Sequence, residues 1–352
     1  MRVLSDDDIA ALLDLGELLD VTADALRAQG RGDVERPPRP HFPVGRGLVD
    51  APSDSAEGGS ATDPCGTGLV MPAYIHGADH YATKVAGVHD GNVERGLPTV
   101  NASITLTAAD TGLPAAMLAG NRITNARTGC IGGLAARELA VPSGEGDGGS
   151  DGGGGSDGDD TEKGMVLGVL GAGEQARWQT RAIRAAVDLA AVRVYSPSDS
   201  REACAADLRA EGIDARAVET PTAAVTGADV VVTATTATEP TFDGNDLKPG
   251  ALVVAVGAYT AEMRELDDRT VERAAACYAD VPAEAADTGD FPTQSGDDLL
   301  PFSDVLSGKD DRSSPTDVLV VASVGTAVLD AAAGEYVLKR AQREERGREL
   351  SL

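Results

Sequence analysis

Lysine and arginine side chains in apolar or rigid surroundings could carry chemistry in this chain. Lys84 lies in the mild apolar stretch 82–86, where burial lowers a lysine pKa and suits it to act as an acid, a base or a carboxylate anchor. Arg127 lies near the start of a helix predicted over 123–139, and its guanidinium fork suits bidentate capture of a carboxylate. Arg39 lies between prolines in rigid extended backbone and is a second candidate. The alternative for Lys84 and Arg39 is a solvent-facing charge.

A glycine-rich turn is the candidate site for a second kind of ligand. The stretch Met165–Ala176, MVLGVLGAGEQA, predicts a buried strand, a tight turn and the first turn of a helix. Gly171 allows the turn, Gly173 lets the backbone approach a pyrophosphate, and the small Ala176 lets the helix pack on the strand. The helix N-terminus then faces the anion. This pattern predicts a dinucleotide-binding corner, with a purely structural strand-turn-helix unit as the alternative.

The end of the next predicted strand bears on which dinucleotide is bound. An acidic residue at this position favours NAD, because it binds the ribose hydroxyls. Here Tyr195 is followed by Ser196-Pro-Ser198, with no carboxylate until Asp199. The small hydroxyls leave room for a 2′-phosphate, which Arg201 could meet. The segment therefore favours NADP and leaves NAD open.

The charge of the chain limits its partners. The 352 residues suffice for two domains, and 57 acidic against 30 basic residues give a net charge of −27. This charge is spread along the chain and argues against nucleic acid or an anionic membrane as a partner. Scarce lysine, few aromatic residues and a dispersed carboxylate surface are typical of a halophilic protein, with an ordinary acidic cytosolic protein as the alternative.

We expect the melting temperature of such a protein to rise with KCl concentration. The physical reason is screening, since the Debye length falls to about 3 Å at 1 M salt and dense like charge is then tolerated. In dilute buffer the same surface repels itself. A melting curve recorded against KCl concentration tests this expectation, and a melting temperature independent of KCl would contradict it.

The cysteine, histidine and hydropathy patterns argue against a disulfide-linked, a metal-binding and a membrane-spanning protein. The cysteines are far apart and form no Cys-x-x-Cys pair, so we expect buried thiols rather than a disulfide frame or a zinc site: Cys65, Cys130, Cys204 and Cys277. His76 and His80 lie four apart in a glycine-containing segment without a third ligand, so no metal site is expected. No apolar run reaches membrane-spanning length, and the N-terminus resembles an acidic helix rather than a signal peptide. A cytoplasmic location is therefore expected.

The two halves of the chain differ in their pattern. Alternating segments over 69–75, 81–88 and 99–107, separated by Gly/Pro turn signals, predict an antiparallel sheet. A helix capped at Ser5 and continuing to Leu19 is predicted before it. After residue 164, alternating strands and helices imply a parallel sheet with crossover helices. The segments of this second half are strands over 192–195, 229–234, 251–256 and 318–321, a polar loop region over 285–315 and a final helix over 326–343.

Several segments together resemble the ornithine cyclodeaminase/mu-crystallin family, which includes archaeal alanine dehydrogenases and ketimine reductases. They occur in family order and cover nearly the whole chain. The matching stretches are Pro38-Arg39, Met71–Tyr74, Lys84, Gly96–Ala102, Thr111–Pro114, Ile123-Thr124, Arg127-Thr128, Gly171–Ala176, Lys248–Gly250, Val256–Ala258, Arg264–Asp267 and Ser323–Gly325.

The resemblance implies an α/β fold of two domains with the active site between them. It implies a discontinuous α+β domain for substrate binding and dimerisation over 1–140 and 320–352, and a Rossmann dinucleotide-binding domain over 164–319. Within the acidic Gly/Ser-rich insertion 141–163, the tract 143–160 has no apolar residue to bury and is expected to be disordered. Relatives of this kind are homodimers that bind NAD(H) or NADP(H) and act on small amino or imino acids.

The resemblance also assigns roles to individual residues. Arg39, Lys84 and Arg127 would hold the substrate carboxylate and neighbouring groups, and Thr99 would line the pocket. The expected cofactor contacts, beside Arg201, are Thr128, Gly171, Ala172, Gly173, Glu174, Gln175, Ser196, Thr235, Val256, Gly257 and Ser323.

One departure from the family pattern affects the predicted reaction. Ornithine-cyclising members carry a Gly-Gly-Asp-type turn whose Asp is the proposed acid/base, and here Tyr259 takes that place. A tyrosine has an ordinary pKa of about 10, so it can donate a proton but is a poor base at neutral pH. This favours hydride transfer between nicotinamide and the α-carbon of an amino or imino acid, with Lys84 or Tyr259 handling a proton. The alternatives are an ornithine cyclodeaminase, which forms proline and ammonia, and a cofactor-binding protein without turnover, against which Lys84 and Arg127 argue.

Overall fold

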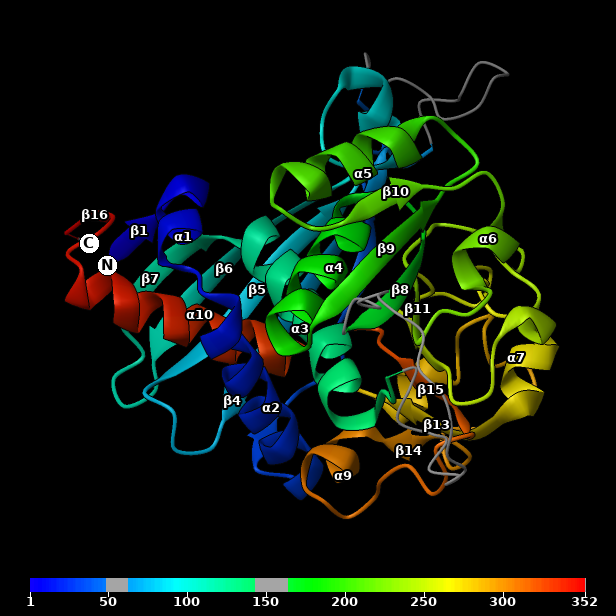
Figure 1. Ribbon diagram of the computed structural model, residues 1–352. Helices are drawn as coiled ribbons and strands as arrows, with labels where there is room; N and C mark the ends of the chain where they lie inside the picture. Colours follow the sequence, from blue (N-terminus) through cyan, green and yellow to red (C-terminus); the bar gives the residue numbers. More distant parts are fainter. Residues whose placement is uncertain (49–62, 143–163, 352) are drawn as a thin grey trace, which may run out of the picture. The chain divides into compact units, whose positions relative to one another are not determined.

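The computed structural model describes residues 1–48, 63–142 and 164–351, and the chain groups into two compact units (Figure 1). Unit 1 comprises Met1–Asp14, Arg31–Arg127 and Thr326–Leu352, and unit 2 comprises Leu15–Gly30 and Thr128–Gly325. Relative to the predicted domains, residues 15–30, 128–140 and 320–325 belong to unit 2, because they pack on its helices and parallel sheet. The predicted insertion 141–163 lies almost entirely outside the described residues.

Unit 1 is built on an eight-stranded sheet of order β16-β1-β7-β6-β5-β4-β2, with β3 pairing β4. All neighbours are antiparallel except β1 and β7. The strands are β1 (Arg2–Leu4), β2 (Val34–Glu35), β3 (His41–Val44), β4 (Gly66–Ile75), β5 (His80–Val88), β6 (Val100–Ala108), β7 (Pro114–Ala119) and β16 (Arg348–Glu349). Its other elements are α1 (Asp6–Leu12), η1 (Asp90–Arg95) and α10 (Ala327–Arg343), and α3 (Gly120–Leu139) begins here and continues into unit 2. The predicted antiparallel sheet is confirmed.

The period of two along β5 explains how this sheet packs. Ala82, Lys84 and Ala86 are buried, whereas Tyr81 and Val85 are exposed. The helix α10 packs against β4, β5 and β6 and covers the buried face. Figure 1 shows this helix, in red, lying along the strands of the same unit. Side chains of β5 at even positions therefore face the helix, which places Lys84 beneath α10.

The N-terminal helix differs from its prediction. Ser5 caps α1 through a capping box with Asp8, as expected from the sequence. The helix ends at Leu13, whose backbone turns extended with ψ 120°, and a second helix, α2 (Leu15–Arg31), starts two residues later. The predicted single helix is therefore wrong: α1 belongs to unit 1, while residues 15–30 of α2 belong to unit 2.

Unit 2 is built on a second eight-stranded sheet, of order β10-β9-β8-β11-β12-β15-β13-β14, in which every pair is parallel. This is the strand order of a doubly wound dinucleotide-binding sheet with β15 inserted between β12 and β13. The strands are β8 (Met165–Leu170), β9 (Leu189–Tyr195), β10 (Ala215–Ala217), β11 (Val230–Thr233), β12 (Leu252–Ala255), β13 (Ala274–Ala279), β14 (Leu300–Pro301) and β15 (Val318–Ala322). The remaining elements are α4 (Glu174–Ala186), α5 (Ser200–Ala210), α6 (Pro221–Val225), η2 (Gly244–Asp246), α7 (Asp268–Arg273), α8 (Pro282–Ala285) and α9 (Phe302–Leu306).

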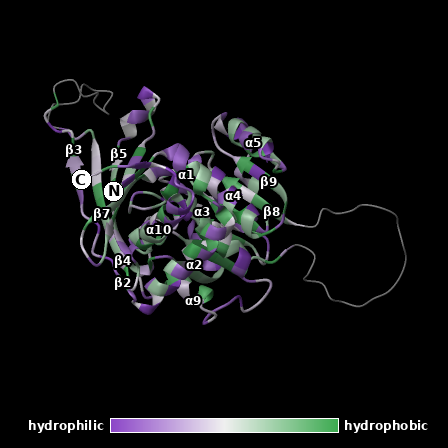
Figure 2. Ribbon diagram, turned by 90° about the vertical axis from the view of Figure 1, so that its left-hand side faces the viewer, coloured by the Kyte–Doolittle hydropathy of each residue, from purple (hydrophilic) through white to green (hydrophobic). Residues whose placement is uncertain are grey.

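Two further details correct the sequence interpretation. Residues 285–315 are not only a polar loop, because β14 and α9 lie within them and Phe291 and Phe302 are buried. All four cysteines are free, but Cys65 is only partly buried, since it lies just before β4 begins. Figure 2 shows green and purple positions side by side along α5, as expected of a helix with one apolar face. Among the described residues, no helix is both long and apolar enough to cross a membrane.

Glycines let α3 lie against α4 within unit 2. A Cβ added to Gly129 would lie 2.6 Å from the Trp178 carbonyl oxygen, and one added to Gly133 would lie 2.7 Å from the Ala182 carbonyl oxygen. Backbone atoms of α4 therefore occupy the space that a side chain on α3 would need. The close approach holds the middle of α4, the helix that follows the glycine-rich turn, against α3.

Replacing Gly129 by alanine should lower the free energy of unfolding by about 1–3 kcal/mol, because the overpacked backbone must move apart. The gain of about 1 kcal/mol in helix propensity does not offset this. Urea unfolding measures the effect. The control is Gly334→Ala on α10, where the new Cβ would lie 3.3 Å from the flexible Leu106 side chain, so that a small effect is expected. Equal stability of both variants would contradict the packing argument.

Candidate active site and nucleotide-binding edge

Three buried charges meet in unit 1. Lys84 on β5 and Asp330 on α10 form an ion pair with 2.6 Å between Nζ and Oδ2. Arg127 on α3 donates from Nε to Oδ1 of the same carboxylate at 3.0 Å. The exposed fractions of Lys84, Arg127 and Asp330 are 3%, 3% and 0%. Two cations thus share one anion, and this charged cluster carries a net positive charge in a dry environment.

The cluster shifts the acidities of its members. Burial lowers the pKa of Lys84 to about 8; the Asp330 carboxylate opposes this, and the charges of Arg127 and Arg39 add to the lowering. Burial alone would raise the pKa of Asp330, but Arg127 and Lys84 hold it below its usual value. Lys84 can therefore exchange a proton near neutral pH, while Asp330 stays ionised.

The cluster can hold a carboxylate from a ligand. Arg127 Nη1 is buried and, among the described residues, has no hydrogen-bond partner. An orphaned guanidinium N–H in a dry site is costly unless an acceptor arrives, and a charge-assisted bond contributes roughly 1.5–3 kcal/mol. The net positive charge supplies the matching attraction. This orphaned donor is the clearest mark of a ligand in unit 1.

The other substrate candidates lie in the same unit. Arg39 precedes β3, is partly buried, and its charge acts on Lys84. Thr99 precedes β6, is partly buried, and its carbonyl accepts from the His89 N–H at 2.9 Å. The structure therefore brings Lys84 and Arg127 into contact through Asp330 and adds Arg39 electrostatically.

Asp330 was missed by sequence reasoning. It stands in the run Ala327–Ala333, which is otherwise uncharged and becomes the buried first half of α10. An acidic residue in such a buried helix face needs a cationic partner. That mismatch between residue type and apolar surroundings was the available signal, and it is the same argument that identified Lys84.

The glycine-rich turn of unit 2 fits an anion. Gly171 has φ +111°, and a Cβ there would lie 2.3 Å from the Ala234 carbonyl oxygen, so only glycine is accepted. Gly173 is the N-cap of α4 and caps it with no side chain, and a Cβ there would meet no atom within 4 Å. The N-terminus of a 13-residue helix is thus left without a side-chain cap beside open space at Gly173, an arrangement that suits pyrophosphate binding. Ala172 lies between the two glycines, and Glu174 and Gln175 open the helix.

The end of β9 carries a cluster of hydroxyls beside a cation. Ser196 Oγ lies 3.2 Å from Ser200 Oγ and 3.5 Å from Ser198 Oγ. Arg201 donates to the carbonyl oxygens of Ser196 and Ser198 at 3.2 Å each, and its Nη2 pairs with Glu219 at 2.9 Å. The cation that was expected to meet a 2′-phosphate is therefore already paired with a mainly exposed carboxylate.

The remaining cofactor candidates lie at or beyond the carboxyl ends of strands or on α3. Thr235 follows β11, Val256 and Gly257 follow β12, and Ser323 follows β15. Asp280, at the end of β13, accepts from the Ser323 hydroxyl at 2.7 Å and from the Gly325 N–H at 2.9 Å. The structure therefore gathers the first four at one edge of the parallel sheet, where ligands of such sheets bind. Thr128 is buried on α3, and its carbonyl accepts from Gln179, while Tyr259 is 51% exposed.

The histidines predicted not to bind metal are His76 and His80. His76 Nε2 lies 3.1 Å from a carboxylate oxygen of Glu35, and His80 Nδ1 lies 3.9 Å from Glu335. Within the ranges 1–48, 63–142 and 164–351, no group of three or more His, Cys, Asp and Glu residues is arranged to hold a metal ion.

Comparisons with known proteins agree with this architecture. An alanine dehydrogenase of Archaeoglobus fulgidus is 25% identical, covering 99% of this chain and 97% of that protein. The ketimine reductase mu-crystallin of Rattus norvegicus is 32% identical, covering 76% and 78%. The Thermococcus litoralis Δ1-pyrroline-2-carboxylate reductase, solved in complex with NADH and L-proline, superposes with a TM-score of 0.83 at 24% identity, covering 99% and 100%, which shows the shared fold.

The family assignment extends over nearly the whole chain. The sequence profile of one family matches residues 2–146 and 160–345, which includes both the charged cluster and the glycine-rich turn. The chain therefore belongs to the ornithine cyclodeaminase/mu-crystallin family.

Proposed function

We propose that this protein is an NAD(P)-dependent oxidoreductase that transfers hydride at the α-carbon of a small amino or imino acid, of the alanine dehydrogenase or ketimine reductase type. The observation that carries the proposal is the buried cluster of Lys84, Arg127 and Asp330 with its orphaned Arg127 N–H. Unit 1 supplies the carboxylate site, and unit 2 supplies the nucleotide corner. The names of the relatives, an alanine dehydrogenase, a Δ1-pyrroline-2-carboxylate reductase and a ketimine reductase mu-crystallin, support the same class.

The residues of this chain then divide the work. Arg127 and Lys84 bind the substrate carboxylate, Arg39 adds positive potential, and Thr99 lines the pocket. Lys84 is suited to move the proton, because its pKa of about 8 lets it act as an acid or a base near neutral pH. Tyr259 is the second proton-handling candidate. When bound, the nicotinamide cofactor supplies or accepts the hydride, and fixing the substrate by its carboxylate supplies much of the remaining rate enhancement through orientation.

The alternative is an ornithine cyclodeaminase, in which the cofactor is reduced and reoxidised within one turnover. Tyr259 stands where cyclising members have an acid/base Asp, which disfavours this reaction. The two functions differ in net cofactor change. We expect steady NADH or NADPH consumption by purified protein in molar KCl with pyruvate plus ammonia, or with a cyclic imino acid. Formation of proline and ammonia from ornithine without net consumption would instead establish the lyase.

For the cofactor we propose NADP in preference to NAD, since hydroxyls and Arg201 stand where an NAD-selective acid is expected. Arg201→Ala should weaken NADPH binding about tenfold and change NADH binding by less than about twofold, because only the 2′-phosphate uses the guanidinium. Fluorescence titration with both cofactors measures this. Glu219→Gln is the matched variant: it frees Arg201 from its ion pair and should strengthen NADPH binding. Equal losses for both cofactors in Arg201→Ala would contradict the assignment.

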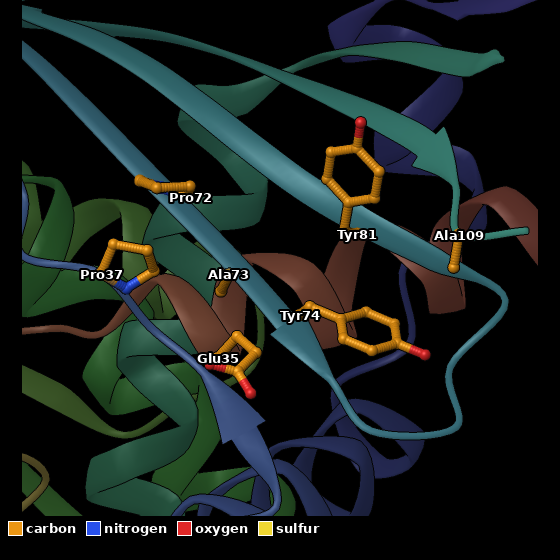
Figure 3. A pocket seen from close by; sticks show the side chains of 7 residues that line it. All are labelled: Glu35, Pro37, Pro72, Ala73, Tyr74, Tyr81 and Ala109. Atoms are coloured by element: carbon orange, nitrogen blue, oxygen red, sulfur yellow. The ribbon is translucent and has the colours of Figure 1, made fainter. Parts of the chain in front are cut away.

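We also propose that the protein is a homodimer formed through the face of the unit 1 sheet opposite α10. Tyr81, Val85 and Met117 lie on this face and are 37%, 50% and 43% exposed. Tyr81 and Tyr74 also line a pocket of about 340 Å³, and Figure 3 shows the two tyrosines standing on the paired strands β5 and β4. An exposed apolar sheet face of this kind is typical of an interface.

Sedimentation in high salt tests the dimer. We expect a mass of twice the 35.8 kDa chain for the wild type. Val85→Asp should shift the protein towards the monomer, because it places a charge in the apolar sheet face that the proposed dimer would bury. The control is Leu113→Asp, at an exposed residue just before β7, which should leave the mass unchanged. A monomeric wild type would contradict the proposal.

A further inference from the structure

One buried carboxylate in unit 2 collects donors from the ends of two neighbouring strands. Glu265 Oε2 accepts from the Thr233 hydroxyl and the Gly257 N–H, both at 2.8 Å. Its Oε1 accepts from the Thr235 N–H at 2.6 Å and from the Thr235 hydroxyl at 2.8 Å. Thr233 ends β11, and Gly257 follows β12. Glu265 has an exposed fraction of 0%, so these four donors replace its hydration entirely.

This arrangement requires the ionised carboxylate. An ionised carboxylate only accepts, and its four lone-pair positions match the four donors, whereas a protonated one would turn a donor of its own towards them. The fit is tight, since a Cβ on Gly257 would lie 2.4 Å from Glu265 Oε1. Asp290 fixes the segment from behind by accepting from the N–H groups of Glu265 at 2.6 Å and Leu266 at 2.9 Å. The side chain is therefore held at both its base and its tip.

The charges around Glu265 make it sensitive to pH. The pKa of Glu265 is raised to about 7, mainly by burial and also by the Asp290 carboxylate, while the hydrogen bonds from Thr235 and Thr233 act in the opposite direction. Asp290, whose own pKa is raised by burial, is the charged group that faces Glu265, and Arg264 acts on Asp290. As pH falls through about 7, Glu265 takes up a proton and at least one donor loses its acceptor.

We propose that Glu265 is a positioning residue that holds the Thr235 and Gly257 loops in the shape that receives the nicotinamide half of the dinucleotide. The inference rests on the proposed function. A dinucleotide lies across the carboxyl ends of the strands of a doubly wound sheet. The adenosine half belongs to the β8–β9 side with its glycine-rich turn, so the β11 and β12 ends that Glu265 joins belong to the other half. Only the ionised carboxylate supports full affinity for that half.

The test compares the affinity for NADH with that for ADP-ribose, which lacks nicotinamide. If the protein binds NADPH instead, the comparison is between NADPH and ADP-ribose 2′-phosphate. Dissociation constants are measured in molar KCl, without substrate, from about pH 8.5 to about pH 6. We expect the wild-type affinity for the whole cofactor to fall about tenfold over this range while that for ADP-ribose stays level. Glu265→Gln, which leaves Lys84 unchanged, should bind the whole cofactor about tenfold more weakly than the wild type at high pH. Its affinity for the cofactor should not depend on pH.

A buried carboxylate at the opposite end of β11 provides the matched control. Asp229 accepts from the Val166 N–H at 2.6 Å and pairs with Lys248. Asp229→Asn should lower stability but keep the wild-type pH profile of the cofactor. If the wild-type affinities for the cofactor and for ADP-ribose changed in parallel with pH, the role of Glu265 would be overturned and the proposed function would stand. This comparison uses only the wild type, so it does not depend on whether a variant folds. Failure of the wild type to bind either cofactor would overturn the proposed function as well.

Discussion

Replacing Asp330 by asparagine should lower the free energy of unfolding by about 3–5 kcal/mol, one of the two largest effects expected in this chain. The substitution keeps the size of the side chain but leaves Lys84 and Arg127 buried without an anion. Arg127 cannot lose its proton, so Lys84 is the group that becomes neutral. Its pKa drops further, because the Asp330 carboxylate raises it in the wild type. Urea unfolding at pH 7 measures the loss of stability.

The same variant should lose activity for a separable reason. At pH 7 Lys84 would be largely neutral, so the substrate carboxylate loses one of its cationic partners and KM should rise. The control is Glu344→Gln at the C-cap of α10, which breaks partly exposed ion pairs with Arg340 and Arg346 and should cost less than about 1 kcal/mol. An Asp330→Asn protein with wild-type stability would show that the three charges are not coupled.

The sequence predicted two of the buried cations of the site, Lys84 and Arg127, but not the carboxylate that pairs with them. Lys84 and Arg127 were identified because charged side chains in apolar stretches need a reason, and that reasoning is local. Asp330 lies more than 200 positions from Arg127, and no local pattern reports which distant helix will cover a given strand. The cluster therefore becomes visible only when α10 packs on β5.

The fold shows the same division between local and distant information. The parallel and antiparallel halves were predicted from their periodicity and turn signals. The segment Ala274–Ala279 was not predicted as a strand, because its alanines favour helix, yet it pairs between β15 and β14. Burial in the sheet overrides that propensity. The insertion of β15 between β12 and β13 is likewise a property of the folded topology, which sequence order does not reveal.

Glu265 illustrates a third case. It belongs to the segment Arg264–Asp267, which was part of the family resemblance, but nothing in the segment indicated a role for the glutamate. Its partners Thr233, Thr235 and Gly257 lie at two strand ends that meet only in the sheet. A carboxylate that accepts from four donors, with no ion-pair partner in the described part of the chain, is recognisable from geometry alone.

Replacing Lys84 by methionine should lower kcat/KM about 10³-fold, since the substrate loses both a carboxylate partner and a proton-transfer group. Cofactor affinity should not change, because Lys84 is not among the residues expected to contact the cofactor. Fluorescence titration of the cofactor and initial rates measure the two quantities separately. Weak catalysis combined with wild-type cofactor binding is the expected result, and an undiminished rate would exclude Lys84 from the reaction.

In the wild type, the rates of the reductive and the oxidative reaction should change with pH in opposite directions. The pKa of Lys84 is lowered to about 8, so the ammonium is present below that pH and the amine above it. Reduction of an imino or keto acid needs the proton, and its rate should fall as pH rises through about 8. Oxidation of the amino acid needs the free amine as base, and its rate should rise over the same range. Any limb near pH 7 that disappears in Glu265→Gln belongs to Glu265 instead.

Lys84→Arg separates the charge of this residue from its proton. Arginine keeps a cation beside Asp330 but does not titrate in this range. Substrate binding should be partly retained, whereas both limbs near pH 8 should vanish and the rate should stay low at every pH. If Lys84→Arg kept the wild-type profiles, the titrating group would be another residue, and Tyr259 would become the first to test, through Tyr259→Phe. The pair of lysine variants thus decides whether the buried cation only holds the substrate or also moves its proton.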